Sequence, residues 1–481
     1  MKNMLSIVCA LGVLTSFDAA AQDGRTIIDA AAREMGTANL QSIGYSGTGS
    51  IFPLGQAATP GGPWPAFKVI KYDAAVNYDG PVMREEVVRI EFDGVPRGGG
   101  AGPYIPATGQ GGIRPIPFGP QTQIQLRDAR SEVGLLQIWM TPHGFLKAAA
   151  NNTTNVRGTT ARTVSFVALG KYTVTGTING RNLVERVETR IDNTLLGDML
   201  VETTYSDYRD YGGIKFPTRI VQRQGGQPTL DLTVSSVQPN GAATLQAPSN
   251  TQTTPPMPLK VEAKKIADGV WDLSGAALHS IAVEFADHLV VVEGPLNDEY
   301  AEAVIAEMKR VAPRKPIRYV VNTHHHSDHA GGIRGFAAEG IAIITHAVNK
   351  PYYEKIFKNA HQINPDRLAR SNRPAIIEGV SEKRILTDGS RSLEIHHVRG
   401  NRHVDGLLMV YLPKEKQLIQ ADAFAPRPGG RPLPSPSPFT VNLYENVQRL
   451  KLDVAQLVHI HGGIDPYEAL VKAAGRNGSL E

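Results

Sequence analysis

The chain has 481 residues, which exceeds the length of one ordinary domain and predicts two or three. Apolar residues make up 41% of it, and 50 Lys and Arg residues nearly balance 46 Asp and Glu residues. This composition fits a globular enzyme, and the balanced charge argues against a nucleic-acid partner, whose binding needs a basic surface.

Residues 1–21 resemble a cleavable secretory signal. An apolar run over 5–17 is followed by small residues at 19–21. The run is too short to span a bilayer, so no transmembrane segment is expected once the signal is removed. The single cysteine, Cys9, falls inside the run, so the mature chain is expected to carry no disulfide. These features predict a periplasmic or secreted protein.

Residues 24–240 are predicted to form a β-rich N-terminal domain. Apolar residues at helical spacing over 26–35 indicate one short helix. Alternating segments over 172–178 and 181–191 then predict two strands, and the Asn-Gly pair at 179–180 predicts a two-residue hairpin between them. The pattern indicates an antiparallel sheet with one face on a core.

A second hairpin is predicted from strands over 214–222 and 230–237, joined by the Gly pair at 225–226. The segment 94–120 is rich in Gly and Pro and predicts a mobile loop. The helix and hairpins, and above all residues 205–217, resemble the curved sheet of periplasmic lipoprotein-carrier-like domains. That resemblance implies a concave apolar surface for an acyl chain or a polypeptide; a packing or dimerising module without a ligand is the alternative.

Residues 241–260 are polar and proline-rich and predict a linker before a second domain over 261–481. Strands alternate with helices in this half, and each strand is nearly continuous in apolar residues. Such a pattern indicates layered α/β packing with the sheet buried between helices. Of the 14 histidines in the chain, 13 lie beyond residue 278, so metal chemistry is expected in this half.

Residues 323–332 contain the pattern His-x-His-x-Asp-His. Imidazole and carboxylate groups suit zinc, manganese or ferrous iron, and four donors so close together can reach two ions only if the backbone turns sharply. A buried strand predicted over 317–321 and the Gly pair at 331–332 favour such a turn. A histidine-rich tract that is solvated or binds metal loosely is the alternative. The four donors are His324, His326, Asp328 and His329.

Three further donors lie where predicted strands begin or end. His403 precedes a strand over 407–412, Asp422 ends a strand over 417–421, and His461 follows another strand. A lone histidine at a strand end is more often a hydrogen-bonded surface residue than a ligand, and Asp422 alone could cap a helix. A sheet would nevertheless fix the positions of such donors and leave one side open to a substrate.

In order and spacing, these seven donors resemble the ligand pattern of the metallo-β-lactamase superfamily, from residue 261 to about residue 474. The resemblance implies an αβ/βα sandwich with two metal ions at one edge of its sheets. Zinc is expected, with iron or manganese as alternatives. The resemblance implies that His324, His326 and His403 hold one ion, that Asp328, His329 and His461 hold the second, and that Asp422 and a water or hydroxide bridge them.

Two such ions, roughly 3.5 to 4 Å apart, would lower the pKa of a shared water toward neutrality and provide a bridging hydroxide. The expected reaction is hydrolysis of a small-molecule ester, lactone, thioester, amide or β-lactam. Asp328 is expected to serve both as a ligand and as the general base. His279 and Arg402 are candidate substrate contacts. His459 is a candidate neighbour of the ligands.

The sequence allows two other interpretations of the function. An iron-dependent oxidoreductase similar to persulfide dioxygenases shares the same motif, whereas diiron relatives carry Glu where this chain has His326. A lipid-binding carrier with a structural metal site would use the N-terminal sheet. Zinc β-lactamases often replace the bridging Asp with Cys or lack it, so Asp422 points to other hydrolase branches. The sequence does not specify the oligomeric state.

Overall fold

The computed structural model describes residues 24–91, 97–99, 121–128, 131–152, 155–157, 162–242, 244–246, 259–371, 373–424 and 436–476. The predicted signal at 1–21, most of the Gly- and Pro-rich segment 94–120 and most of the predicted linker 241–260 lie outside the described residues. Among the described helices, none combines the length and the hydrophobicity that a bilayer span requires.

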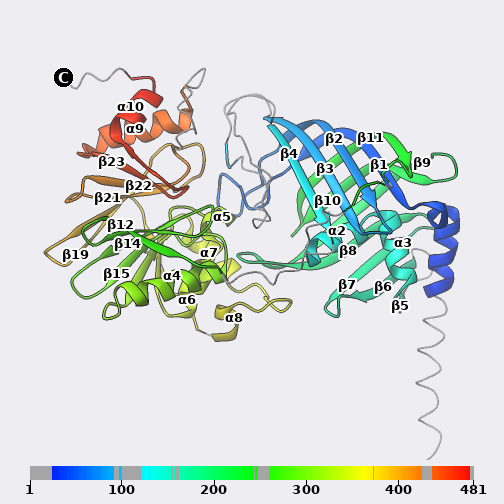
Figure 1. The fold of residues 1–481 in the computed structure, drawn as a ribbon, viewed down its shortest axis with the longest axis horizontal. Helices are drawn as coiled ribbons and strands as arrows, with labels where there is room; N and C mark the ends of the chain where they lie inside the picture. Colours follow the sequence, from blue (N-terminus) through cyan, green and yellow to red (C-terminus); the bar gives the residue numbers. More distant parts are fainter. Residues whose placement is uncertain are drawn as a thin grey trace, which may run out of the picture.

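Within the described residues, the N-terminal half forms an 11-stranded antiparallel sheet in the order β4-β3-β2-β1-β11-β10-β9-β8-β7-β6-β5 (Figure 1). This arrangement confirms the predicted antiparallel domain. The strands are β1 Ser42–Ile51, β2 Phe67–Asn77, β3 Val82–Glu91, β4 Gln121–Asp128, β5 Asn155–Arg157, β6 Arg162–Ala168, β7 Tyr172–Ile178, β8 Val184–Asn193, β9 Gly197–Asp210, β10 Lys215–Gln224 and β11 Gln227–Pro239.

The helices of this half pack on the buried face of the sheet. Strand β9 shows the alternation, because Met199, Val201, Thr203 and Tyr205 are buried while Leu200, Glu202 and Thr204 between them are partly exposed. Phe145, from a helix, joins the same core. A Cβ atom at Gly176 would lie 2.2 Å from its ring, so the sheet approaches the helix closely there. The helices are 24–34, η1 Thr37–Asn39, α2 Glu132–Trp139 and α3 Pro142–Ala150.

The two predicted hairpins of this sheet have different outcomes. The two-residue turn at 179–180 is wrong, because β7 and β8 are joined by residues 179–183. The Asn179 side chain accepts hydrogen bonds from the N–H groups of Arg181 and Leu183, at 3.0 and 3.1 Å, and so stabilises a longer turn. The Gly turn at 225–226 is confirmed, with φ angles of 57° and 83°, as a tight hairpin requires.

The C-terminal half contains two sheets in its described residues. The 7-stranded sheet has the order β12-β13-β14-β15-β16-β17-β18, and the 6-stranded sheet has the order β19-β20-β21-β22-β23-β24. The strands are β12 Glu262–Ala267, β13 Val270–Ser274, β14 Ser280–Glu284, β15 Leu289–Val292, β16 Ile317–Val321, β17 Ala342–His346, β18 Ile377–Val380, β19 Lys383–Thr387, β20 Ser392–His397, β21 Leu408–Leu412, β22 Gln417–Gln420, β23 Gln456–His459 and β24 Ile464–Pro466.

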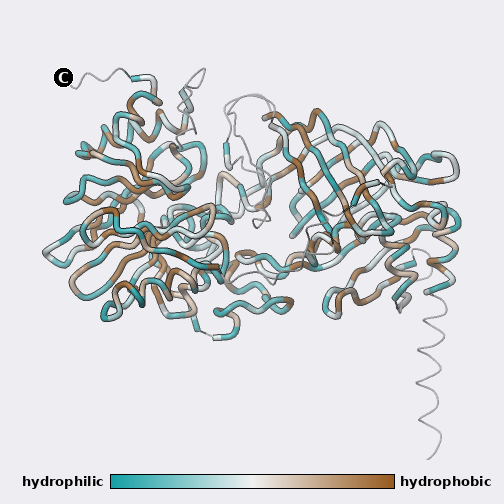
Figure 2. Tube along the Cα trace, in the orientation of Figure 1, coloured by the Kyte–Doolittle hydropathy of each residue, from teal (hydrophilic) through white to brown (hydrophobic). Residues whose placement is uncertain are grey.

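The two sheets pack face to face and carry helices on their outer faces. In β21, Leu408 and Val410 join the core shared with the first sheet, whereas Met409 and Tyr411 pack with Leu443 of a covering helix. Figure 2 shows these apolar strands at the centre of this half. The predicted αβ/βα sandwich is therefore confirmed. Its helices are α4 Asp298–Val311, α5 Ser327–Ala330, α6 Ile333–Ala338, α7 Lys350–Ile356, α8 Arg367–Ser371, α9 Pro438–Leu450 and α10 Tyr467–Ala473.

Among the described residues, the two halves contact each other at several places, including backbone hydrogen bonds from two connections between strands. The connection between β1 and β2, residues 52–66, reaches the C-terminal half, where the Ala58 carbonyl accepts a hydrogen bond from the N–H of Asp405 at 2.7 Å. The turn between β8 and β9 forms the second contact, where the N–H of Asp198 donates to the Ala360 carbonyl at 2.7 Å. The first contact lies directly beside the candidate site.

Candidate metal centre

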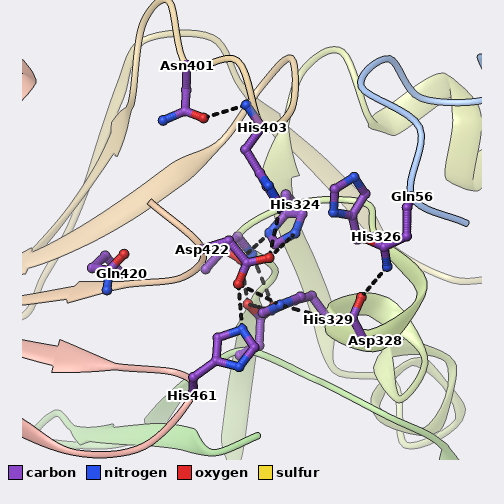
Figure 3. A network of polar contacts seen from close by, with 12 residues as sticks. Gln56, His324, His326, Asp328, His329, Asn401, His403, Gln420, Asp422 and His461 are labelled. Atoms are coloured by element: carbon purple, nitrogen blue, oxygen red, sulfur yellow. Dashed lines mark hydrogen bonds and ion pairs between the residues drawn. The ribbon is translucent and has the colours of Figure 1, made fainter. Parts of the chain in front are cut away.

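The predicted donors lie on loops at the ends of strands in both C-terminal sheets. His324 and His326 follow β16, and the next turn of chain forms α5, which carries Asp328 and His329. From the second sheet, the β20–β21 connection carries His403, and the chain beyond β22 and β23 carries Asp422 and His461. Figure 3 shows these side chains around one space; six of them join the donor groups described below, whereas Asp328 lies beside them and joins none of these groups.

Asp422 lies at the centre of the cluster. Its Oδ2 atom is 2.8 Å from His403 Nε2 and 3.6 Å from His324 Nε2. Its Oδ1 atom is 2.6 Å from His461 Nε2 and 3.1 Å from His329 Nε2. The two oxygens of one carboxylate therefore face two different pairs of histidines, as a carboxylate that bridges two cations would.

The donor atoms form three groups, of which two share Asp422 and the other is Glu293, His324 and His329. Within each group, one ligand atom from every residue lies within 4.8 Å of the others. Histidine nitrogens and carboxylate oxygens at such spacing fit a transition-metal site. The first group is His324, His326, His403 and Asp422, and the second is His329, Asp422 and His461.

The unpaired ring nitrogens of the predicted ligands also fit a metal site. Among the predicted ligands, four buried ring nitrogens form no hydrogen bond with acceptable geometry to any described residue. Unpaired buried polar atoms are costly, and two cations, one in each group that contains Asp422, would satisfy all four. These atoms are His324 Nε2, His326 Nδ1, His329 Nε2 and His403 Nε2.

Burial and neighbouring charges set the pKa values of the histidines. Burial and the adjacent His329 ring hold the pKa of His324 well below its usual value, so His324 stays neutral, the form that binds metal. Burial also lowers the pKa of His326. Burial disfavours the charged form of His329 as well, but the carboxylates of Asp422 and Asp328 outweigh it and raise its pKa well above the usual value.

Asp328 lies beside the second group. Its Oδ2 atom is 3.7 Å from His329 Nε2, and its Oδ1 atom accepts a hydrogen bond from Gln56 Nε2 at 2.8 Å. Gln56 comes from the N-terminal half, and the sequence patterns gave no reason to select it. The adjacent Ala57 carbonyl is 3.0 Å from His326 Nε2. The N-terminal half therefore contributes to the surroundings of two predicted ligands.

Glu293 is a second residue near the donors that no sequence motif indicates. Its buried carboxylate follows β15, lies 3.1 Å from His329 Nδ1 and accepts a hydrogen bond from the backbone N–H of Thr323 at 3.2 Å. Thr323 Oγ1 donates to Glu293 and lies 2.9 Å from His324 Nδ1. Glu293 thus leaves the Nε2 atoms of both histidines free for a metal ion. A lone carboxylate directly after an apolar strand was the available signal.

Two of these carboxylates have strained backbone conformations. Glu293 has a φ of 74° and Asp422 has a φ of 59°, in the left-handed region that favours glycine. Such conformations persist when the surrounding structure imposes them, and they concentrate at functional sites. The strain therefore supports a functional role for both carboxylates.

The secondary candidates lie around the cluster. His279 Nδ1 pairs with Asp272 Oδ1 at 2.7 Å, and its ring packs against the backbone of Gly462, next to His461. His459 lies between Gln420 and Asp465, at 2.6 and 3.0 Å, and does not join either donor group.

The backbone carbonyl of Arg402 accepts a hydrogen bond from the N–H of Gly98 at 3.1 Å. This bond connects the loop that carries His403 to the N-terminal half. The substrate roles of His279 and Arg402 stay predictions.

Comparison with known proteins identifies the class of this half. Residues 279–461 match the sequence model of the metallo-beta-lactamase superfamily. The match runs from the start of β14 to the His461 donor and covers every predicted ligand, so the resemblance of the C-terminal half is confirmed. The resemblance of the N-terminal half to lipoprotein carriers stays a prediction.

Two curated relatives share a short stretch with the chain. An alkyl/aryl-sulfatase from Saccharomyces cerevisiae is 33% identical over 76 residues, which are 16% of this chain and 12% of the relative. A linear primary-alkylsulfatase from a Pseudomonas species is 30% identical over 76 residues, 16% of this chain and 11% of the relative. The matched stretch thus spans about an eighth of each relative.

Solved structures of similar proteins include two metallo-beta-lactamases. The enzyme from Pontibacter korlensis is 18% identical, with a TM-score of 0.34, and the match covers 45% of this chain and 98% of that chain. The mono-zinc form of FIM-1 from Pseudomonas aeruginosa is 19% identical, with a TM-score of 0.35, and the match covers 46% and 96% of the two chains.

Proposed function

We propose that this protein is an exported metal-dependent hydrolase that binds two divalent cations, most simply zinc, in the cluster around Asp422. The observation that carries the proposal is the division of donors into two groups that share one carboxylate. Three of the donor histidines, His324, His326 and His329, are fully buried, which favours a specific site over loose surface binding. Export rests on the signal-like residues 1–21.

The chain's own residues fit hydrolysis. When bound, the two cations would polarise the scissile group and activate a water at neutral pH. Asp328 Oδ1 is occupied by Gln56, so Oδ2 is the atom available to accept a proton from the attacking water and pass it to the leaving group. The side chain of His461 is 41% exposed, whereas that of His329 is fully buried, so substrate approaches from the His461 side.

The substrate class is an ester, lactone, thioester, amide or β-lactam of a small molecule. Both curated relatives are named as alkylsulfatases, which adds sulfate esters to the substrates to test. The loop that carries His403 borders the cluster and contacts the N-terminal half through Arg402, so both halves contribute to the wall around the substrate.

The test is turnover by the purified full chain, loaded with zinc, on a panel of an alkyl sulfate, a lactone, a thioester, a phosphodiester and nitrocefin. We expect at least one substrate to be cleaved. Asp328→Asn should lower kcat by about 100-fold or more while KM changes little, because the amide cannot accept the proton. Unchanged turnover in Asp328→Asn would remove the general-base role. Oxygen uptake with bound iron and no hydrolysis would favour the oxidoreductase alternative.

A further inference from the structure

The connection between β1 and β2 belongs to the N-terminal sheet but ends on residues of the metal centre. Gln56 Nε2 donates a hydrogen bond to Asp328 Oδ1 at 2.8 Å (Figure 3). The next residue, Ala57, places its carbonyl oxygen 3.0 Å from His326 Nε2. Two consecutive residues of one half therefore contact two predicted ligands of the other.

The packing of this connection is specific. Gln56 is only 4% exposed, and its carbonyl accepts a hydrogen bond from the N–H of Gly99 at 3.1 Å. A Cβ atom at Gly99 would lie 1.8 Å from Gln56 Oε1, so a side chain there would displace the Gln56 amide from its present position. Ala57 packs with Trp64 and Met199 in a small apolar cluster of the N-terminal half. The side chain of Gln56 is therefore held in one place by its own half.

The two contacts have a clear chemical meaning for the ligands. A metal-ligating histidine usually donates its second N–H to a neighbouring acceptor, which fixes its tautomer and orientation. The Ala57 carbonyl takes that role at His326 and leaves Nδ1 directed to the cluster. The Gln56 amide occupies Asp328 Oδ1 and leaves Oδ2 toward His329. Gln56 thus selects which oxygen of the carboxylate faces the second donor group.

We propose that Gln56 is a positioning residue of the second metal position, so that the N-terminal half helps to set the affinity of the site for its second ion. This inference rests on the proposed function, because it needs the second group, His329, Asp422 and His461, to bind a cation with Asp328 beside it. The first group has no contact with the Gln56 side chain among the described hydrogen bonds, so its ion is retained when Gln56 is changed.

The test is stepwise metal binding to the full chain, stripped with a chelator and titrated with zinc against a chromophoric competitor. Cobalt is the second probe, because its visible spectrum reports the coordination of each ion. Gln56→Leu removes the amide donor and keeps a similar volume. Thr59→Val is the matched control, because Thr59 Oγ1 donates to Asp405 Oδ2 at 2.8 Å from the same connection but contacts no predicted ligand.

We expect the wild-type chain and Thr59→Val to bind two ions each. The affinities of Thr59→Val should match those of the wild-type chain. In Gln56→Leu, the affinity for the second ion should fall by about 10- to 100-fold, while the first affinity stays unchanged. The metal-free variant should stay folded with a somewhat lower Tm, because Asp328 Oδ1 loses its donor. Two unchanged affinities in Gln56→Leu, an equal loss of both, or the same loss in Thr59→Val would overturn the inference and leave the proposed function standing. A wild-type chain that binds only one ion would overturn both.

Discussion

Glu293 shows how a residue that is not a predicted ligand controls the cluster. Its carboxylate contacts His329 directly and reaches His324 through the Thr323 hydroxyl. The two rings are thereby held with Nε2 toward the same space, where Asp422 approaches both. A carboxylate that orients ligand rings in this way typically contributes about 10- to 100-fold to metal affinity.

Glu293→Gln should weaken zinc binding by about 10- to 100-fold, because an amide offers one acceptor where the carboxylate serves both Thr323 and His329. The measurement is the zinc dissociation constant, from competition with a chelator. Glu302→Gln, on the exposed face of α4, is the matched control and should bind zinc as the wild type does. Equal affinities for both variants would contradict the role of Glu293.

Asp422→Asn tests the shared carboxylate. Asparagine tolerates the left-handed backbone that Asp422 adopts, with a φ of 59°, so the fold should be retained. We expect the stoichiometry of tightly bound zinc to fall from two to one or none, because an amide is a poor bridge. Metal quantification after gel filtration, together with circular dichroism, checks both points. Two tightly bound ions in a folded variant would show that Asp422 is dispensable.

The pattern of donors could be predicted from the sequence because their chemistry is local. The spacing from His324 to His329 restricts them to one turn of chain, and His403 and His461 fall beside recognisable strands. Gln56 and Glu293 could not be predicted in this way. Each acts through a contact with residues far away in the chain, and an isolated Gln or Glu has many ordinary structural roles.

At the scale of elements, most predictions that depended on periodicity are confirmed, and the error at 179–180 arose from a side chain. The pair at 179–180 fits a tight turn, but Asn179 binds the backbone of the following residues and lengthens the turn. Side-chain bonds of this kind compete with the expected turn without changing the local composition. Helix α4 begins where its sequence indicates, since the Asn297 side chain accepts a hydrogen bond from the N–H of Tyr300 at 2.9 Å.

His143 connects three elements of the N-terminal half, and we expect its titration to make the free energy of unfolding depend on pH. Its ring lies 2.8 Å from Thr37 Oγ1 in η1 and 3.1 Å from the Lys215 carbonyl in β10. Burial lowers its pKa from 6.5 to about 4. In the unfolded chain, His143 therefore binds a proton below about pH 6.5, whereas in the folded chain it binds one only below about pH 4. The free energy of unfolding should fall as pH decreases through this window.

The size of this effect is on the order of 3 kcal/mol between pH 7 and pH 4. His143→Gln should remove that part of the pH dependence, because its amide does not titrate. The measurement is the free energy of unfolding from urea titrations at several pH values, for both proteins. Other buried histidines titrate equally in both, so only the difference in slope reports on His143. Parallel curves would show that His143 is not responsible.

At the scale of the whole molecule, the two halves contact each other through backbone groups that side-chain patterns do not reveal. Gly197 lies at the second contact with a φ of 81°, and a Cβ atom there would lie 2.5 Å from the Ala360 carbonyl. Next to it, Asp198 donates its N–H to the same carbonyl and accepts one from the N–H of Gln362 at 2.7 Å. This contact leaves no space for a side chain.

Gly197→Ala should destabilise the contact between the halves by about 2 to 3 kcal/mol, because the new methyl group adds a clash to the backbone strain. Gly212→Ala is the matched control, with a φ of 71° and open space around it, and should cost only about 1 kcal/mol of strain. Scanning calorimetry measures the unfolding of both variants. We expect the unfolding transitions of the two halves to separate in Gly197→Ala. Identical traces for the two variants would contradict a tight contact at Gly197.

The measurement that tests the central claim most directly is anomalous diffraction at the zinc absorption edge from crystals of the zinc-loaded protein. We predict two peaks on either side of the Asp422 carboxylate, one among His324, His326 and His403, and the other among Asp328, His329 and His461. No peak in the cluster, or zinc only at other positions of the chain, would contradict the account.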